Sequence, residues 1–171
     1  YKTVACASEM AKSGCDVHVA MSPGALEFIR PLTFAAVTRN PVIESVFPDA
    51  SSAKNKGLYP HIYPASEADL FVLAPASANM LAKLALGLAE DAVCTSALAL
   101  PSACKRIFCP SMHANMWAQA SVQRNVQALA ADGWLQVGPN KGQLACGGEG
   151  AGRMAEPRDI VAAVRVALKG G

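Results

Sequence analysis

The apolar residues of this chain change their spacing at regular intervals, which predicts strands that alternate with helices. Strands are expected over four short apolar or alternating runs, at 16–21, 69–74, 106–110 and 134–138. The run at 69–74, DLFVLA, has no polar alternation, as is typical of a strand buried on both faces of a parallel sheet.

Helices are predicted between these strands from apolar residues at helical spacing and from Ala- and Leu-rich composition. The expected helices cover 2–13, 25–38, 76–98, 117–131 and 157–168. Pro31 interrupts the second, and 76–98 forms either one helix or two around Gly87. Such an order specifies an α/β fold with a mostly parallel sheet. A long irregular loop at 41–63 and a glycine-rich flap at 142–152 complete the pattern.

Length and composition narrow the class of protein. A chain of 171 residues is expected to form a single domain, 1–171. Charged residues make up only 16% and hydrophobic residues 52%, so part of the surface is expected to contact other protein. The net charge is +2 and the basic residues are scattered singly, which argues against binding to nucleic acid or to a membrane surface.

The cysteines and histidines do not have the spacing of a metal site. The six cysteines include no CxxC pair and the three histidines are separate from them, so no metal is expected. No apolar run reaches the roughly 18 residues of a membrane span. Free thiols in a chain of this kind indicate a reducing compartment, and we expect a cytoplasmic protein.

Three loops follow predicted strands and carry small or polar residues, at 22–24, 75–79 and 110–113. In a parallel sheet, ligands bind outside the carboxyl ends of the strands. Any one of these loops alone is explained equally well as an ordinary Pro/Ser turn. Together they predict a ligand site at one edge of the sheet.

Three ordered motifs resemble a known family. They read HIYPASEADLFVLAPASANMLAKLALGLAEDAV at 61–93, CPSMHANMW at 109–117 and LACGGEGAGRMAEP at 144–157. In this order they resemble the flavin-containing cysteine decarboxylases, and among these the phosphopantothenoylcysteine type. The resemblance runs from Tyr1 to about Leu168.

The resemblance implies a flavodoxin-like (Rossmann-like) three-layer α/β fold in a homotrimer that binds FMN. It also implies decarboxylation of 4'-phosphopantothenoylcysteine to 4'-phosphopantetheine, a step of coenzyme A biosynthesis. Family members begin with a strand and a Gly/Ser turn for the FMN phosphate, whereas this sequence opens inside the following helix, at Tyr1.

The roles of individual residues are likewise implied by the resemblance. His61 matches the active-site base, and Cys146, in the glycine-rich flap, matches a proton donor. His113 and Met116 match substrate-binding positions. The expected cofactor contacts are Ser22, Ser77, Ala78, Asn79, Met80 and Ser111.

Two positions depart from the family's pattern. Met80 replaces a more usual threonine, and His113 replaces the asparagine that holds the substrate carboxylate. The second departure leaves alternatives open. One is a decarboxylase of peptides that end in cysteine, and another is a flavin-binding or regulatory protein without turnover. Cys146 favours the phosphopantothenoylcysteine reaction, because reduction of the ene-thiol requires a proton donor.

Overall fold

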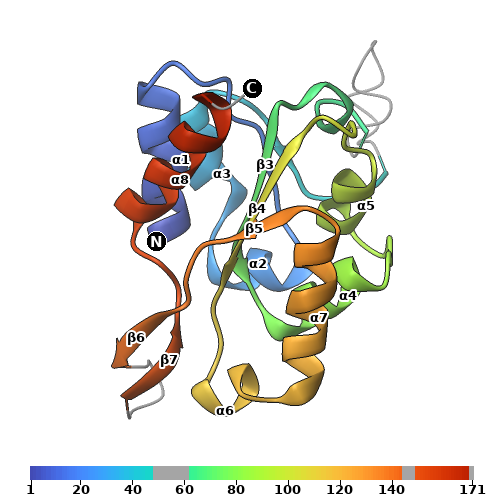
Figure 1. Cartoon of the computed structure of the whole chain (residues 1–171). Helices are drawn as coiled ribbons and strands as arrows, with labels where there is room; N and C mark the ends of the chain where they lie inside the picture. Colours follow the sequence, from blue (N-terminus) through green and yellow to red (C-terminus); the bar gives the residue numbers. More distant parts are fainter. Residues whose placement is uncertain (48–61, 144–148, 170–171) are drawn as a thin grey trace. The chain divides into compact units, whose positions relative to one another are not determined.

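The structure is a computed structural model that describes residues 1–47, 62–143 and 149–169 (Figure 1). The chain forms two compact units. Unit 1 comprises Tyr1–Ala68 and Leu88–Cys104, and unit 2 comprises Asp69–Gly87 and Lys105–Gly171. The expectation of a single domain stays a prediction.

Unit 1 contains two short parallel strands and several helices. Its elements are α1 (Lys2–Lys12), β1 (Val19–Ala20), α2 (Pro23–Phe28), α3 (Pro31–Thr38), β2 (Val42–Ile43), the 3-10 turn η2 (Ala65–Glu67) and α5 (Ala92–Leu98). Strand β1 pairs with β2, with Val19 opposite Val42. Strand β2 lies in a stretch where the sequence predicted only a loop.

The core of unit 1 is built around buried Ala7, Met21 and Phe34. The helix expected at 25–38 is two helices, because Ile29 and Arg30 are both extended, with Arg30, just before Pro31, at φ −79° and ψ 141°. Proline disfavours helical geometry in the residue before it and suits the first helical position. Pro31 therefore starts α3 and separates it from α2.

Unit 2 is built on a three-stranded parallel sheet in the order β3-β4-β5. Its elements are β3 (Leu70–Ala76), α4 (Ala78–Ala85), β4 (Lys105–Pro110), α6 (Ala114–Trp117), α7 (Ala120–Ala131), β5 (Trp134–Gln136), β6 (Asn140–Gln143), β7 (Glu149–Arg153) and α8 (Pro157–Lys169). The stretch 76–98 therefore forms two helices, and Gly87 after the first has a left-handed φ of +67°.

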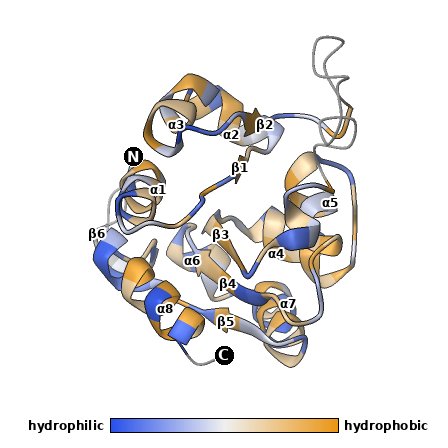
Figure 2. Ribbon diagram, turned by 90° about the horizontal axis from the view of Figure 1, so that it is seen from above, coloured by the Kyte–Doolittle hydropathy of each residue, from blue (hydrophilic) through white to orange (hydrophobic). Residues whose placement is uncertain are grey.

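Helices cover both faces of this sheet, with α8 on one side and α4 and α7 on the other (Figure 2). The sheet contributes fully buried Ile107 and Phe108, while the helices contribute Leu81, Leu129 and Ile160. A parallel sheet covered by helices confirms the predicted α/β, flavodoxin-like fold.

The glycine-rich segment after β5 is more regular than the sequence indicated. Its described residues form an antiparallel hairpin in which β6 pairs with β7. The sequence predicted only a glycine-rich flap here, because small residues without side-chain periodicity give no strand signal. The carboxyl end of the hairpin leads into buried Met154 and Ala155.

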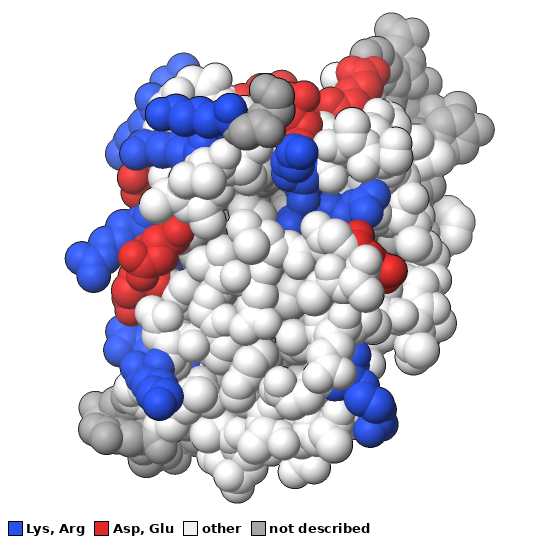
Figure 3. Space-filling view, in the orientation of Figure 1, with Lys and Arg blue, Asp and Glu red and all other residues white. Residues whose placement is uncertain are grey.

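The described residues also show whether membrane-spanning helices, metal-binding groups or dense surface charge occur among them. None of their helices is long and apolar enough to cross a membrane. Within the same residues, no group of three or more His, Cys, Asp or Glu side chains could hold a metal ion. Charged side chains are sparse over much of the surface in Figure 3.

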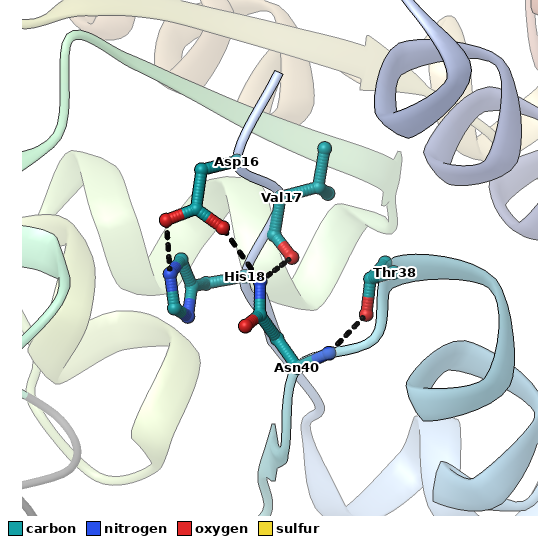
Figure 4. Close-up of polar contacts among 5 residues, drawn as sticks. All are labelled: Asp16, Val17, His18, Thr38 and Asn40. Atoms are coloured by element: carbon teal, nitrogen blue, oxygen red, sulfur yellow. Dashed lines mark hydrogen bonds and ion pairs between the residues drawn. The ribbon is translucent and has the colours of Figure 1, made fainter. Parts of the chain in front are cut away.

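A polar cluster in unit 1 joins the start of β1 to the end of α3 (Figure 4). Asn40 Nδ2 donates to Asp16 Oδ1 (2.7 Å) and to the Val17 carbonyl (3.0 Å). His18 Nε2 donates to Asp16 Oδ2 (3.1 Å). The hydrogen bond from Asn40, followed by the hydrogen bond and charge of His18, lowers the pKa of Asp16 below its ordinary value.

We predict that Asn40→Ala destabilises the protein in a pH-dependent way. The variant loses the bond to the Val17 carbonyl, a net contribution of about 1 kcal/mol. It also returns the Asp16 pKa toward its ordinary value. Because the pKa of Asp16 is lowered in the folded protein, the stabilisation that comes from this shift is complete above the unfolded pKa of about 4. It is lost as the pH falls through the folded pKa of Asp16.

Urea unfolding at several pH values measures both effects. The control is Asn125→Ala, because Asn125 is half-buried in α7, outside the cluster. Alanine favours helices, so the control should unfold within about 0.5 kcal/mol of the parent. Equal losses in the two variants would contradict the role of Asn40.

Candidate functional site

Two of the three predicted ligand loops are joined at the carboxyl edge of the sheet in unit 2. The backbone N–H of Ser111, just after β4, donates to the carbonyl of Ala76 at the end of β3 (3.0 Å). Pro110 is paired with Ala76 in the sheet register. The Ser77–Met80 and Ser111–Met116 segments therefore leave the same sheet edge side by side.

The first segment starts helix α4. Ser77 is the N-cap, and its Oγ accepts the N–H of Met80 (3.2 Å). Because the first N–H groups of a helix have no partner within it, those of Ala78 and Asn79 face outward at this end. The side chain of Asn79 is exposed, whereas Met80 is buried with Leu81 and Leu84.

The second segment starts the short helix α6. His113 is the N-cap, and its Nδ1 accepts the N–H of Asn115 (3.1 Å). A backbone N–H can only donate, so Nδ1 carries no hydrogen and Nε2 carries the ring hydrogen. The His113 side chain is exposed, and Met116 on α6 is 46% exposed.

This tautomer lets His113 offer the hydrogen-bonding groups of the asparagine that the family resemblance implies at this position. An asparagine N-cap accepts a helix N–H with its side-chain oxygen and keeps its NH2 group as a donor. His113 offers the same pair, with Nδ1 as acceptor and Nε2–H as donor. The sequence alone does not show which ring nitrogen is the acceptor, whereas the cap uses Nδ1.

The donor set of these segments fits the polar edge of a flavin. The groups are neutral donors and acceptors: the N–H groups at the start of α4, the amide of Asn79 and the hydroxyl of Ser111. Such groups can bind a heterocycle that presents both carbonyl oxygens and ring nitrogens. The expected contact Ser22 belongs to unit 1, where its Oγ caps α2 by accepting the N–H of Ala25 (3.3 Å).

Both predicted catalytic residues, His61 and Cys146, lie outside the described residues, and their roles stay predictions. Three other cysteines, Cys94, Cys104 and Cys109, are buried. Burial, and then the charge of Glu9, raises the pKa of the Cys6 thiol to about 11. Cys6 is therefore a protonated, unreactive thiol near neutral pH.

One glycine next to the site has a structural role that the sequence did not indicate. Gly152 lies in the glycine-rich flap that the sequence predicted at 142–152, yet it is buried in β7. Its carbonyl accepts the N–H of Met112, one residue before His113 (2.9 Å). A close backbone approach requires glycine, and only the three-dimensional structure shows such an approach.

Comparison with known proteins places the chain among flavoproteins. A family profile described as "Flavoprotein" matches residues 1–169. The coenzyme A biosynthesis bifunctional protein CoaBC of Bacillus subtilis is 38% identical over 161 residues, which cover 94% of this chain and 38% of that protein. A probable phosphopantothenoylcysteine decarboxylase of Streptococcus mutans is 37% identical, and the match covers 94% of this chain and 88% of that protein.

Solved structures agree in fold. A mutant PPC decarboxylase in complex with pantothenoylaminoethenethiol has a TM-score of 0.80 and 26% identity, covering 96% of this chain and 93% of that one. The FMN-binding protein AtHal3 has a TM-score of 0.80 and 27% identity, covering 99% and 94%. This chain spans only about 38% of the length of the bifunctional Bacillus subtilis relative.

We predict that the cap at α6 depends on an acceptor at position 113. His113→Asn retains one and should keep the Asn115 amide protected from hydrogen exchange. His113→Ala removes it, which should expose the amide and cost about 1 kcal/mol. Hydrogen exchange followed by NMR, with imidazole ¹⁵N shifts in the parent to identify the Nε2–H tautomer, measures both. Equal exchange at Asn115 in all three proteins contradicts the cap.

Proposed function

This chain belongs to the Flavoprotein family, and we propose that it catalyses the flavin-dependent decarboxylation of 4'-phosphopantothenoylcysteine to 4'-phosphopantetheine. The observation that carries the proposal is the 37% identity to the Streptococcus mutans protein, which extends over most of both chains. The two hydrogen-bonded segments at the sheet edge, with their neutral donors, are consistent with it.

We propose FMN as the flavin. A structural relative is named an FMN-binding protein, and flavodoxin-like folds bind a mononucleotide at the carboxyl edge of the sheet. When bound, the flavin supplies a reversible two-electron oxidation of the substrate, which creates an electron sink next to the departing carboxylate. The start of α4 and Asn79 would bind the flavin ring, and Ser111 is a further proposed contact. Ser22, in unit 1, stays a prediction that the family resemblance implies.

The proposed roles of the protein residues divide between binding and proton transfer. His113, in the site described above, donates its Nε2–H to the substrate carboxylate, and Met116 lines the substrate pocket. His61 accepts the proton released when the substrate is oxidised. Cys146 donates a proton to the ene-thiol that remains after carbon dioxide has left. The net reaction releases one carbon dioxide and takes up one proton.

We also propose a homotrimer, as the family resemblance implies. Large apolar side chains are exposed on both units, among them Phe28 (93%) and Leu32 (76%) on unit 1 and Leu86 (71%) on unit 2. Apolar surface of this kind is stabilised when another subunit covers it. Light scattering of the full-length protein should give a trimer or a multiple of three, and a monomer would contradict this proposal.

The test of function is incubation of the full-length protein with phosphopantothenoylcysteine, with carbon dioxide and the aminothiol both measured. We predict equal amounts of the two products and FMN as the cofactor released by acid. Release of FAD would contradict the cofactor assignment.

Two outcomes would replace the proposed function. Turnover of a peptide with a C-terminal cysteine, but not of phosphopantothenoylcysteine, would identify a peptidyl-cysteine decarboxylase. Flavin binding without turnover of either substrate would identify a binding or regulatory protein.

A separate prediction concerns Cys146. Serine has nearly the same size but is a far weaker acid, so Cys146→Ser should release about one carbon dioxide per site and accumulate the ene-thiol. Quenched-flow product analysis measures the ratio of carbon dioxide to aminothiol. The control is Cys104→Ser, a buried cysteine of unit 1, which should keep the two products equal. Equal products from Cys146→Ser would remove Cys146 from the proton-transfer step.

A further inference from the structure

The segment that carries His113 is held at both ends. Its helix α6 has only four residues and cannot be stable alone. At the carboxyl end, Gln123 Nε2 donates to the carbonyl of Trp117 (2.6 Å). At the amino end, the N–H of Met112 donates to the carbonyl of Gly152 in β7 (2.9 Å).

The contact at Gly152 leaves no room for a side chain. A Cβ added there would overlap the Met112 carbonyl oxygen and would come within 3.3 Å of the Met112 carbonyl carbon and 3.4 Å of the Ala114 nitrogen. These backbone atoms flank His113 on both sides. Any residue other than glycine at position 152 must therefore displace the backbone on either side of His113.

The loop, rather than the strand, would give way. Strand β7 leads into Met154 and Ala155, which are 6% and 1% exposed, and Arg153 forms an ion pair with Glu156 (2.9 Å) at the start of α8. His113, in contrast, is exposed. Displacing the buried side costs more, because it disrupts close-packed core residues.

From this geometry we propose that Gly152 is a positioning residue that sets where His113 presents its Nε2–H to the substrate carboxylate. This rests on the proposed function for the role of His113, whereas the contact between Gly152 and Met112 does not. Gly152 touches no reacting atom and acts through Met112 and the cap of α6.

A matched control lies in the same hairpin. Gly142 has a φ of +152° and Gly152 has a φ of +158°, so an added Cβ imposes a similar backbone cost at both. At Gly142 the Cβ would meet only the side chain of Arg153, at 3.7 Å or more. The difference between Gly152→Ala and Gly142→Ala therefore isolates the collision with the His113 segment.

The first measurement needs no substrate. In the flavin-loaded protein, Gly152→Ala should speed hydrogen exchange of the Met112 and Asn115 amides at least about tenfold, and Gly142→Ala should leave both near the parent. Unchanged exchange in Gly152→Ala overturns the proposal. If Gly152→Ala does not fold, a variant in which an ester replaces the Met112 amide removes only the N–H that binds Gly152. This ester variant should speed hydrogen exchange of the Asn115 amide, and unchanged exchange of that amide would also overturn the proposal.

The second measurement is a double-mutant cycle on kcat/KM with phosphopantothenoylcysteine. We expect Gly152→Ala to lower kcat/KM about tenfold in the parent and less than about threefold in a His113→Ala background, because the affected contact is already gone. Equal losses in both backgrounds mean a general structural effect and overturn the positioning role. An inactive parent refutes the proposed function and with it the role toward substrate, while the exchange data still decide whether Gly152 fixes the segment.

Discussion

The hydrogen bond from the Ser111 N–H to the Ala76 carbonyl (3.0 Å) is the contact on which the candidate site depends. It continues the parallel pairing of β3 and β4 one residue beyond the end of β4, although the register shifts between Leu73 and Ala76. Because both strands end at this point, the helices that follow, α4 and α6, start from the same edge. Their N-terminal groups are thereby available to one ligand.

The sequence predicted the parts of the fold that carry a strong side-chain pattern. The uniform apolar run at 69–74 identified the strand β3 correctly. In the described part of the chain, however, β3 is an edge of the three-stranded sheet, and only Leu73 and Ala76 of its residues are buried. Strand β2 and the β6-β7 hairpin were missed for the opposite reason: one is two residues long, and the other is rich in glycine. These strands pair through backbone N–H and C=O groups, which leave no pattern of side chains in the sequence.

The same distinction applies to the site. The loops that contain Ser77 and His113 were predicted from their positions after strands, and the family resemblance implied the roles of the two residues. Both residues are N-caps in the structure. The tautomer of His113 was not predictable, because it is set by the Asn115 amide. Gly152 was not predictable as a contact either, since the absence of a side chain does not reveal which atoms approach. Both properties come from backbone geometry fixed by tertiary packing.

The hydrogen bond that Nδ1 of His113 accepts has a consequence for the proposed reaction. A decarboxylase must bind a carboxylate and then release it as uncharged carbon dioxide, so a contact that favours the charged ground state raises the barrier. A cationic side chain would bind the substrate carboxylate tightly and would thereby disfavour its conversion to uncharged carbon dioxide. A neutral N–H donor orients the carboxylate with a weaker charge preference. Because the cap occupies Nδ1, His113 can supply such a donor only through Nε2, in a direction fixed by the start of α6.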